Sequence, residues 1–320
     1  MSYKFSVNEP VEEAIVRAAR EQLDRAVTEL SEGVSEDPVK AVHSARKAIK
    51  KERSLLRLAR GSMSRKQRRG ENRVLREAAR ALSGTRDADV MVAALDGLAE
   101  RFVGQLPATT FDAIREQLNA RRARTNGASG GAPDAQAVQE LGSVRLRVDD
   151  WQLRKQGWGA IEAGLNLTFK RGRKAFARAK ASRSPEDLHD WRKRVKDLWY
   201  QQRLLAPTGG LAVRGQAKEA HRLADLLGDD HDLFVLREVL VTPAMTAPVD
   251  VDAVVKLLDL RRDELQLEAL ALGKRVYAES PKAFRRRMKR LWLAGQALGA
   301  APLERDPAEV AAATREPQPS

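Results

Sequence analysis

Apolar residues recur at helical spacing through most of the chain, and clusters of glycine and proline separate the segments. After Pro10, the apolar positions from Ile15 to Leu30 lie three or four residues apart, which predicts a helix with one buried face. Ser31-Glu32-Gly33 predicts the end of this helix. We find no convincing run of alternating, β-branched residues. The pattern therefore predicts an all-α fold.

Further segments carry the same period. They cover residues 71–82, 88–103, 110–124, 135–141, 161–180 and 251–277, and a last helix begins at Pro281. A basic loop is expected over residues 64–69, an irregular stretch from 142 to 152, and a Pro-containing connection from 242 to 249. The Gly-rich residues 126–133 predict a flexible linker, and residues 301–320 a frayed tail.

Two segments combine an apolar face with a cationic face. Residues 42–59 and 188–205 both contain the pattern H-x-x-R-K-x-[IV]-K, and each has a further arginine downstream. Because a helix turns about every 3.6 residues, these side chains share a face. The first cationic stripe consists of His43, Arg46, Lys47, Lys50 and Arg57, and the second of His189, Arg192, Lys193, Lys196 and Arg203. The apolar stripes behind them are Val42, Ala45, Ile49 and Leu56, and Leu188, Trp191, Val195 and Leu198.

The cationic stripes contain almost no acidic residue. Like charges three or four residues apart on a helix repel each other by a few tenths of a kcal/mol, about 0.2–0.5 per pair. A solvated helix face would usually mix Glu with Lys, so the uncompensated charge indicates an anionic ligand. The next predicted helix carries Arg73, Arg76 and Arg80 on one side, where they would flank the site.

The two basic segments belong to an internal repeat. Asp37-Pro38 and Ser184-Pro185 provide the same start signal, an N-cap followed by proline at the first helical position. A second block also repeats, with His231 in place of Arg86, at an offset of 145 against 146 for the basic helices. The repeat predicts two bundles of about four helices each, related by a pseudo-two-fold around a basic groove or pore.

The domain boundaries follow from this repeat. The first half is expected over residues 1–124, a linker over 125–157, the second half over 158–300, and a flexible tail over 301–320.

Composition points to a polyanionic partner. The 320 residues include 58 Lys and Arg against 44 Asp and Glu, a net charge of +14. Cysteine is absent, which rules out disulfides and thiolate chemistry. The start of the sequence lacks the apolar core of a signal peptide, and no apolar run has the length of a membrane span. We therefore expect a cytoplasmic protein that does not use a membrane as its partner.

Other kinds of site have weaker support. Four histidines without a metal-ligand spacing argue against a metal site, and no phosphate loop, nucleophile–base pair or paired carboxylates indicate catalysis or a cofactor. His43 and His189 fit a structural role as well as a ligand contact, whereas His221, His231 and the five tryptophans are expected to be structural. Two alternatives to a protein that only binds an anionic polymer stay open: a nucleic-acid-associated protein and a polyphosphate hydrolase. The low Tyr and Phe content argues against a binder that stacks bases.

Both copies of the basic pattern, together with Leu82–Val90 and Leu227–Asp232, resemble the CHAD domain family. The likeness extends from about Val11 to Leu298. It implies two four-helix bundles around a positively charged channel, binding of inorganic polyphosphate, location on polyphosphate granules for many members, and no catalysis. The ligand-facing residues would be the two cationic stripes. The exchange of Arg86 for His231 implies that the two halves contribute unequally.

Overall fold

The computed structural model describes residues 3–82, 87–128, 135–242 and 249–300, and within these ranges the chain contains helices and no strand. The all-α prediction is confirmed. The larger helices are α1 (Val11–Thr28), α3 (Pro38–Leu58), α4 (Arg65–Ala81), α5 (Asp87–Arg101), α6 (Ala108–Ala128), α7 (Ala135–Arg147), α8 (Gly157–Ser182), α9 (Pro185–Leu240), α10 (Val251–Val276) and α11 (Pro281–Ala300). A π-helical turn (Glu29–Gly33) and the short α2 (Val34–Glu36) join α1 to α3, and 3-10 turns follow α3 and α7.

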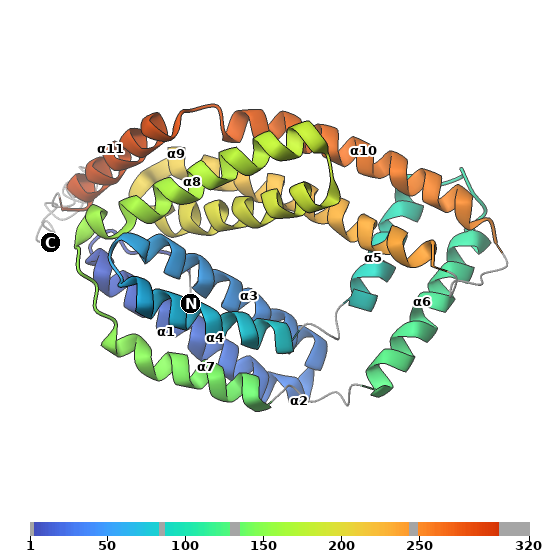
Figure 1. Ribbon diagram of the computed structural model, residues 1–320, viewed down its shortest axis with the longest axis horizontal. Helices are drawn as coiled ribbons and strands as arrows, with labels where there is room; N and C mark the ends of the chain where they lie inside the picture. The colour runs from blue at the N-terminus through green and yellow to red at the C-terminus, as the bar shows by residue number, and fades with distance from the viewer. Residues whose placement is uncertain (1–2, 83–86, 129–134, 243–248, 301–320) are drawn as a thin grey trace, which may run out of the picture.

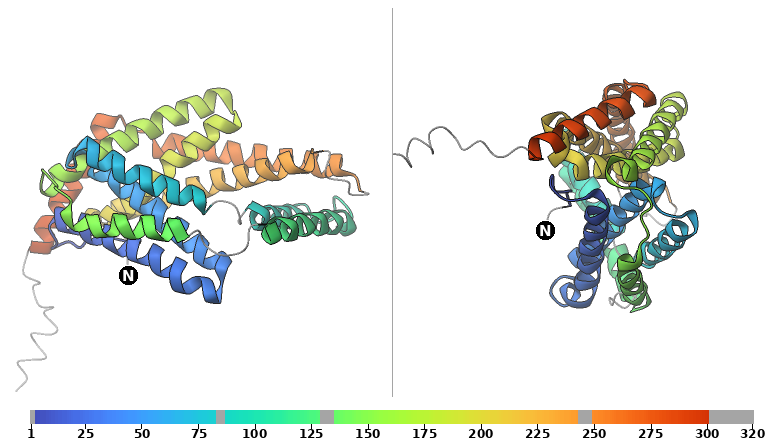
Figure 2. Two further views of the ribbon diagram at one scale, coloured as in Figure 1. Left: turned by 60° about the horizontal axis from the view of Figure 1, so that its bottom comes forward. Right: turned by 90° about the vertical axis from the view of Figure 1, so that its left-hand side faces the viewer.

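The helices form two packed groups and a projecting pair (Figure 1). One group contains α1, α3, α4 and α7, which contact one another, and the other contains α8, α9, α10 and α11. The hairpin of α5 and α6 extends to one side and contacts the second group through α9 and α10. Figure 2 shows the two groups stacked face to face, with α3 on the side of the first group that meets α8 and α9.

The predicted apolar faces form the core. Ala45, Ile49 and Leu56 of α3 are buried, and so is the whole apolar stripe of α9, in which Trp191 is completely inaccessible. Trp151, Trp158 and Trp292 are also buried, as expected. Burying these side chains is the main force that fixes which face of α3 and α9 remains free for charge.

The helix α9 is a hairpin and not a straight rod. Gly210 interrupts it with φ 66° and ψ −160°, a conformation that residues with a Cβ rarely adopt. The rings of His189 and His231 lie 4.4 Å apart, although 42 residues of straight helix would separate them by about 63 Å. The reversal therefore brings the second part of α9 beside the first.

Several helix boundaries differ from the sequence prediction. The expected basic loop at 64–69 is the first turn of α4, because the Ser64 hydroxyl accepts a hydrogen bond from the Gln67 amide at 3.1 Å and caps the helix. The expected irregular stretch after Leu141 is helical to Arg147, because Val144 continues the buried face of α7. Likewise, helix α1 does not end at Ser31 but continues through the π-helical turn into α2.

Some predicted segments lie outside the described residues. They are residues 83–86 of the repeated block, residues 129–134 of the expected linker, residues 243–248 of the connection and the tail 301–320. Among the helices that are described, none combines the length and the apolar character needed to cross a membrane.

Candidate functional site: a cationic groove between α3 and α9

Helix α3 begins with the predicted cap. The Asp37 carboxylate accepts a hydrogen bond from the Lys40 amide at 3.0 Å, and Pro38 occupies the first helical position. With one face of α3 buried, the opposite face presents a line of cations at spacings of four, three and four residues. This line consists of Arg46, Lys50, Arg53 and Arg57.

Helix α9 begins in the same way. The Ser184 hydroxyl accepts a hydrogen bond from the Asp187 amide at 3.2 Å, and Pro185 follows. Its apolar side is buried around Trp191. The free side presents His189, Arg192, Lys193, Arg194 and Lys196 toward α3.

Buried polar contacts hold the two helices where they cross. Ser54 of α3 donates its hydroxyl proton to the backbone carbonyl of Asp197 at 3.2 Å, and Gln201 of α9 donates its side-chain amide to the Ser54 carbonyl at 3.3 Å. Both side chains are fully buried. These bonds fix the distance between the two cationic faces at this crossing.

Helix α8 comes very close to the end of α3 because Gly164 has no side chain. A Cβ built at Gly164 would lie 1.9 Å from the Leu58 carbonyl oxygen and 2.5 Å from that of Arg57, far below any real contact. Only glycine permits this approach. It brings the α8 side chains next to Arg57 and Arg60.

The space between α3 and α9 is a groove of about 520 Å³, which we call the cationic groove. Eight Lys and Arg side chains line it against two carboxylates, with two histidines, Tyr200 and two valines completing the wall. The cations are Arg46, Lys50, Arg53, Arg57, Arg192, Lys193, Arg194 and Lys196, and the carboxylates are Asp197 and Asp232. An anionic chain would meet a strong excess of positive charge here.

Both carboxylates lie beside arginines. Asp197 is 3.2 Å from Arg57 across the groove and 3.9 Å from Arg194 on its own helix. Asp232 is 3.7 Å from Arg192. Burial raises the pKa of Asp197 above its ordinary value even though Arg57 and Arg194 pull it down. For Arg53, burial followed by repulsion from Arg57 lowers the pKa to about 10.

The two histidines of the groove form a neutral pair. Burial lowers the pKa of His189 to about 4, with further lowering by His231 and Lys193. His231 has its pKa lowered to about 4 as well, by burial and by Arg192 and Lys196. Both rings are therefore uncharged at neutral pH, because burial, and to a smaller extent the surrounding cations, disfavour a positive charge.

The groove gathers seven of the thirteen residues predicted from the sequence. They are Arg46, Lys50, Arg57, His189, Arg192, Lys193 and Lys196. The other six lie elsewhere. Lys47 is exposed on α3, about 100° around the helix from Arg46. His43 lies about one helical turn before Lys47 and does not line the groove.

The remaining predicted residues face other surfaces. Arg73, Arg76 and Arg80 are exposed on α4, which packs on α3 and α7. Arg203 lies beyond the helix crossing and affects the pKa values of Tyr3 and Lys51 instead.

Sequence reasoning missed three basic side chains of the groove, two arginines and a histidine. Arg53 lies on the same helical line as Lys50 and Arg57, so the spacing alone would have identified it. Arg194 was not selected because it occupies an unspecified position of the repeated pattern, directly after Arg192 and Lys193. His231 was assigned a structural role, and only the α9 hairpin brings it to His189.

No group of three or more potential metal-ligating side chains is present in the described part of the chain. The chemistry that the groove can offer is recognition of anions by guanidinium, ammonium and imidazole donors. Arginine can bind two phosphate oxygens at once, whereas lysine acts as a point charge.

Comparison with known proteins places this site in a family context. The sequence model of the CHAD domain matches residues 15–241. Two uncharacterised proteins of Mycobacterium tuberculosis, MT2285 from strain CDC 1551 / Oshkosh and Rv2226 from strain ATCC 25618 / H37Rv, are each 29% identical over 255 residues, which cover 75% of this chain and 47% of the relative. The chain thus spans about half the length of these relatives.

Two solved structures share the fold. PptA from Streptomyces chartreusis has a TM-score of 0.54 at 14% identity and covers 89% of this chain and 100% of its own. The CHAD domain from the plant Ricinus communis has a TM-score of 0.54 at 15% identity and covers 90% of this chain and 95% of its own.

Proposed function

Because this chain belongs to the CHAD domain family, which is associated with polyphosphate binding, we propose that it binds inorganic polyphosphate along the cationic groove. One observation carries the proposal: eight Lys and Arg side chains from α3 and α9 face the same groove against two carboxylates. A linear phosphate chain has a high negative charge density to match this excess of positive charge, and an extended shape to match a groove between two helices.

Binding is driven by electrostatics in this proposal. Each cation that neutralises a phosphate releases condensed counterions, as in nucleic-acid binding. Arg46, Arg53 and Arg192 supply two-point contacts to phosphate oxygens, and the more exposed Lys50 and Lys193 supply point charges. The neutral His189 and His231 serve as hydrogen-bond donors.

We further propose that the two basic helices descend from a duplicated unit. Both have a capping side chain, a proline at the first helical position and a cationic face toward the same groove. In this view the pseudo-two-fold between the halves brings α3 and α9 together. Association with polyphosphate granules would follow from binding of the polymer.

The proposal is of a binding protein and not of a hydrolase. Each carboxylate of the groove lies within 4.0 Å of an arginine, an arrangement that favours anion binding over metal-assisted hydrolysis. Incubation with long-chain polyphosphate and Mg²⁺, followed by a phosphate assay, tests this point. Release of orthophosphate above the buffer rate would contradict it.

Titration calorimetry tests the binding proposal. Lys50→Glu with Lys193→Glu reverses two exposed charges of the groove, so the fold should be retained while the affinity for long-chain polyphosphate falls at least about tenfold, roughly 1.4 kcal/mol. The matched control is Lys218→Glu with Lys256→Glu, which changes the net charge equally at exposed positions outside the groove. The control should bind like the wild type.

The same titration separates polyphosphate from nucleic acid. Duplex DNA and RNA of equal phosphate concentration are compared at one salt concentration. Tighter binding of polyphosphate supports the proposal. Equal affinity for DNA, or an equal loss in the control variant, would mean that net charge and not the groove determines binding.

A further inference from the structure

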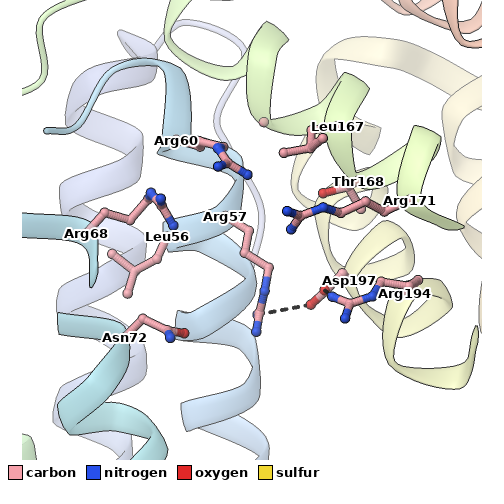
Figure 3. Close-up of a pocket in the computed structure, with 11 residues that line it drawn as sticks. Leu56, Arg57, Arg60, Arg68, Asn72, Leu167, Thr168, Arg171, Arg194 and Asp197 are labelled. Atoms are coloured by element: carbon pink, nitrogen blue, oxygen red, sulfur yellow. Dashed lines mark hydrogen bonds and ion pairs between the residues drawn. The ribbon is translucent and has the colours of Figure 1, made fainter. Parts of the chain in front are cut away.

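A second cavity lies behind the cationic groove, between α3, α4, α8 and α9. It has a volume of about 250 Å³, and we call it the arginine chamber (Figure 3). Five arginines line it: Arg57, Arg60, Arg68, Arg171 and Arg194. Asp197 is the one carboxylate in its lining, and it sits at the side shared with the groove.

Three of these arginines have no counterion within the described ranges of the chain. Among the described residues, neither a hydrogen bond nor an ion pair is formed by the Arg60, Arg68 or Arg171 side chains. The Nε atom of Arg68 is buried and has no hydrogen-bond partner in this part of the chain. A buried donor of this kind costs free energy unless a ligand or solvent satisfies it.

The arginines come from opposite sides and meet in one place. Arg57 extends from the end of α3 and Arg60 from the 3-10 turn that follows, and Arg171 extends toward them from α8, as Figure 3 shows. Burial, followed by repulsion from Arg60, lowers the pKa values of both Arg68 and Arg171. The chain thus holds several guanidinium groups close together, and a bound anion would offset their mutual repulsion.

The chamber and the groove adjoin at an ion pair. Arg57 and Asp197 face both cavities, and their 3.2 Å contact spans from α3 to α9 at the junction. A long chain that lies in the groove therefore meets this bridge before it reaches the chamber.

The chamber fits a small, highly charged anion. Its volume lies below the range of about 300–1,000 Å³ that is usual for larger ligands. Asn72 accepts a hydrogen bond from Arg53 at 3.2 Å through its Oδ1, so its amide protons remain available as donors. The buried Thr168 hydroxyl adds a neutral donor. The wall is otherwise apolar, with Leu56 and Leu167.

We propose that the arginine chamber binds one compact phosphate group, separately from the chain in the cationic groove. The group would be free orthophosphate or the terminal phosphate of a polyphosphate chain. Only this second source rests on the proposed function. The chemistry in both cases is a tetrahedral oxyanion held by Arg60, Arg68 and Arg171.

Calorimetry with sodium orthophosphate at constant ionic strength tests the chamber. The variant Arg68→Gln with Arg171→Gln should bind orthophosphate at least about tenfold more weakly than the full wild-type chain. The control Arg65→Gln with Lys174→Gln removes the same charge from exposed positions of α4 and α8 and should bind like the wild type. Because the removed charges repel one another, the chamber variant should melt no earlier than the wild type.

Two further arms identify the source and keep the proposals apart. If long-chain linear polyphosphate displaces bound orthophosphate and cyclic trimetaphosphate does not, the chamber takes the end of a chain. If orthophosphate stays bound in the presence of the long chain, the chamber takes the free anion. The groove variant Lys50→Glu with Lys193→Glu should lose long-chain affinity and keep orthophosphate binding.

The outcomes are distinct. Wild-type protein that binds long chains without saturable orthophosphate binding overturns the chamber and leaves the proposed function intact. Equal losses in the chamber and control variants also overturn it. Orthophosphate binding without any long-chain binding supports the chamber and contradicts the proposed function.

Discussion

Asp197 is one of the two carboxylates of the groove, and it also lines the chamber. It lies 3.2 Å from Arg57 and lines both the groove and the chamber, so it would compete with a bound phosphate for the same arginine. A buried carboxylate that is paired in this way contributes little net stability, because desolvation offsets the attraction. If the groove binds polyphosphate as proposed, Asp197 would lower its affinity.

We predict that Asp197→Asn strengthens binding of long-chain polyphosphate by about three- to tenfold, up to about 1.4 kcal/mol. The substitution keeps the shape and removes the repulsion between the carboxylate and phosphate. Calorimetry measures the change, and Asp252→Asn, exposed in the first turn of α10, provides the control for net charge. Weaker binding by a folded Asp197→Asn protein would show that the ion pair organises the site.

Glu52 is a buried acid of α3 that takes no part in the groove. It is fully inaccessible, and neither carboxylate oxygen has a hydrogen-bond partner among the described residues. Burial, with a smaller contribution from Glu71, raises its pKa from 4.5 to about 8. The folded protein therefore holds this proton over a range in which the unfolded chain releases it.

The sign of the pH effect follows from this shift. Below about pH 4.5 both states are protonated, and between there and about pH 8 the unfolded state is favoured by up to about 1.4 kcal/mol per pH unit. We predict that the free energy of unfolding falls as pH rises through this window. Denaturant melts of the wild type and of Glu52→Gln measure it, and the variant should show a flatter profile. Identical profiles would mean that Glu52 is solvated.

The hairpin of α9 gives the groove a feature that neither basic helix has alone. It brings His231 against His189, and the pair faces Lys193 and Lys196 on α9 and Arg262 on α10. Both pKa values are lowered to about 4. A bound polyanion would oppose the cations that cause part of this shift.

We predict that long-chain polyphosphate binding takes up protons and tightens as pH falls from 7 to 5. The sign follows because the ligand raises the histidine pKa values, so the complex holds more protons than the free protein. Calorimetry in buffers with different ionisation enthalpies measures the uptake. His189→Gln with His231→Gln should reduce it, and an unchanged uptake in that variant would assign it to other groups.

Gly164 fixes how α8 meets α3 and thereby forms the chamber. A Cβ at this position would overlap the carbonyl oxygens of Arg57 and Leu58. We predict that Gly164→Ala destabilises the fold by about 1–3 kcal/mol and weakens orthophosphate binding, since α8 must move away together with Arg171.

The same helix supplies the control for this prediction. A Cβ at Gly159 would meet nothing closer than 3.9 Å, so Gly159→Ala should leave stability unchanged or raise it by up to about 1 kcal/mol. Thermal denaturation compares the two variants. Equal stabilities would show that α8 does not depend on the close approach at Gly164.

At the scale of the whole molecule, the sequence predicts those features that depend on residue spacing within one helix. The line of Arg46, Lys50 and Arg57 follows from spacing, and the buried face with Ile49 follows from the same period. Features that depend on how helices cross were not predictable in this way. Arg203 repeats Arg57 in sequence but lies beyond the crossing at Ser54 and Gln201, away from the groove.

The arginine chamber shows the same limit. Arg60 follows α3, Arg68 is in α4 and Arg171 is in α8, and no spacing relates them. Their convergence depends on the contact at Gly164, whose importance comes from the packing of two backbones. The glycine itself gives no signal in the sequence, because another helical glycine, Gly159, meets nothing closer than 3.9 Å.

The net charge of +14 would attract any polyanion, so the groove must be distinguished from the whole surface. Salt dependence provides this distinction, because the slope of log affinity against log salt counts the phosphates that are neutralised. By analogy with single-stranded nucleic acid, each contact contributes about 0.7 to the slope. We predict that Lys50→Gln with Lys193→Gln lowers the slope for long-chain polyphosphate by about 1.4, two contacts on this scale. Titrations of this variant and of Lys218→Gln with Lys256→Gln at several salt concentrations measure it. An equal fall in both variants would mean that phosphates spread over the surface, whereas a fall in the first alone would confine the chain to the space between α3 and α9.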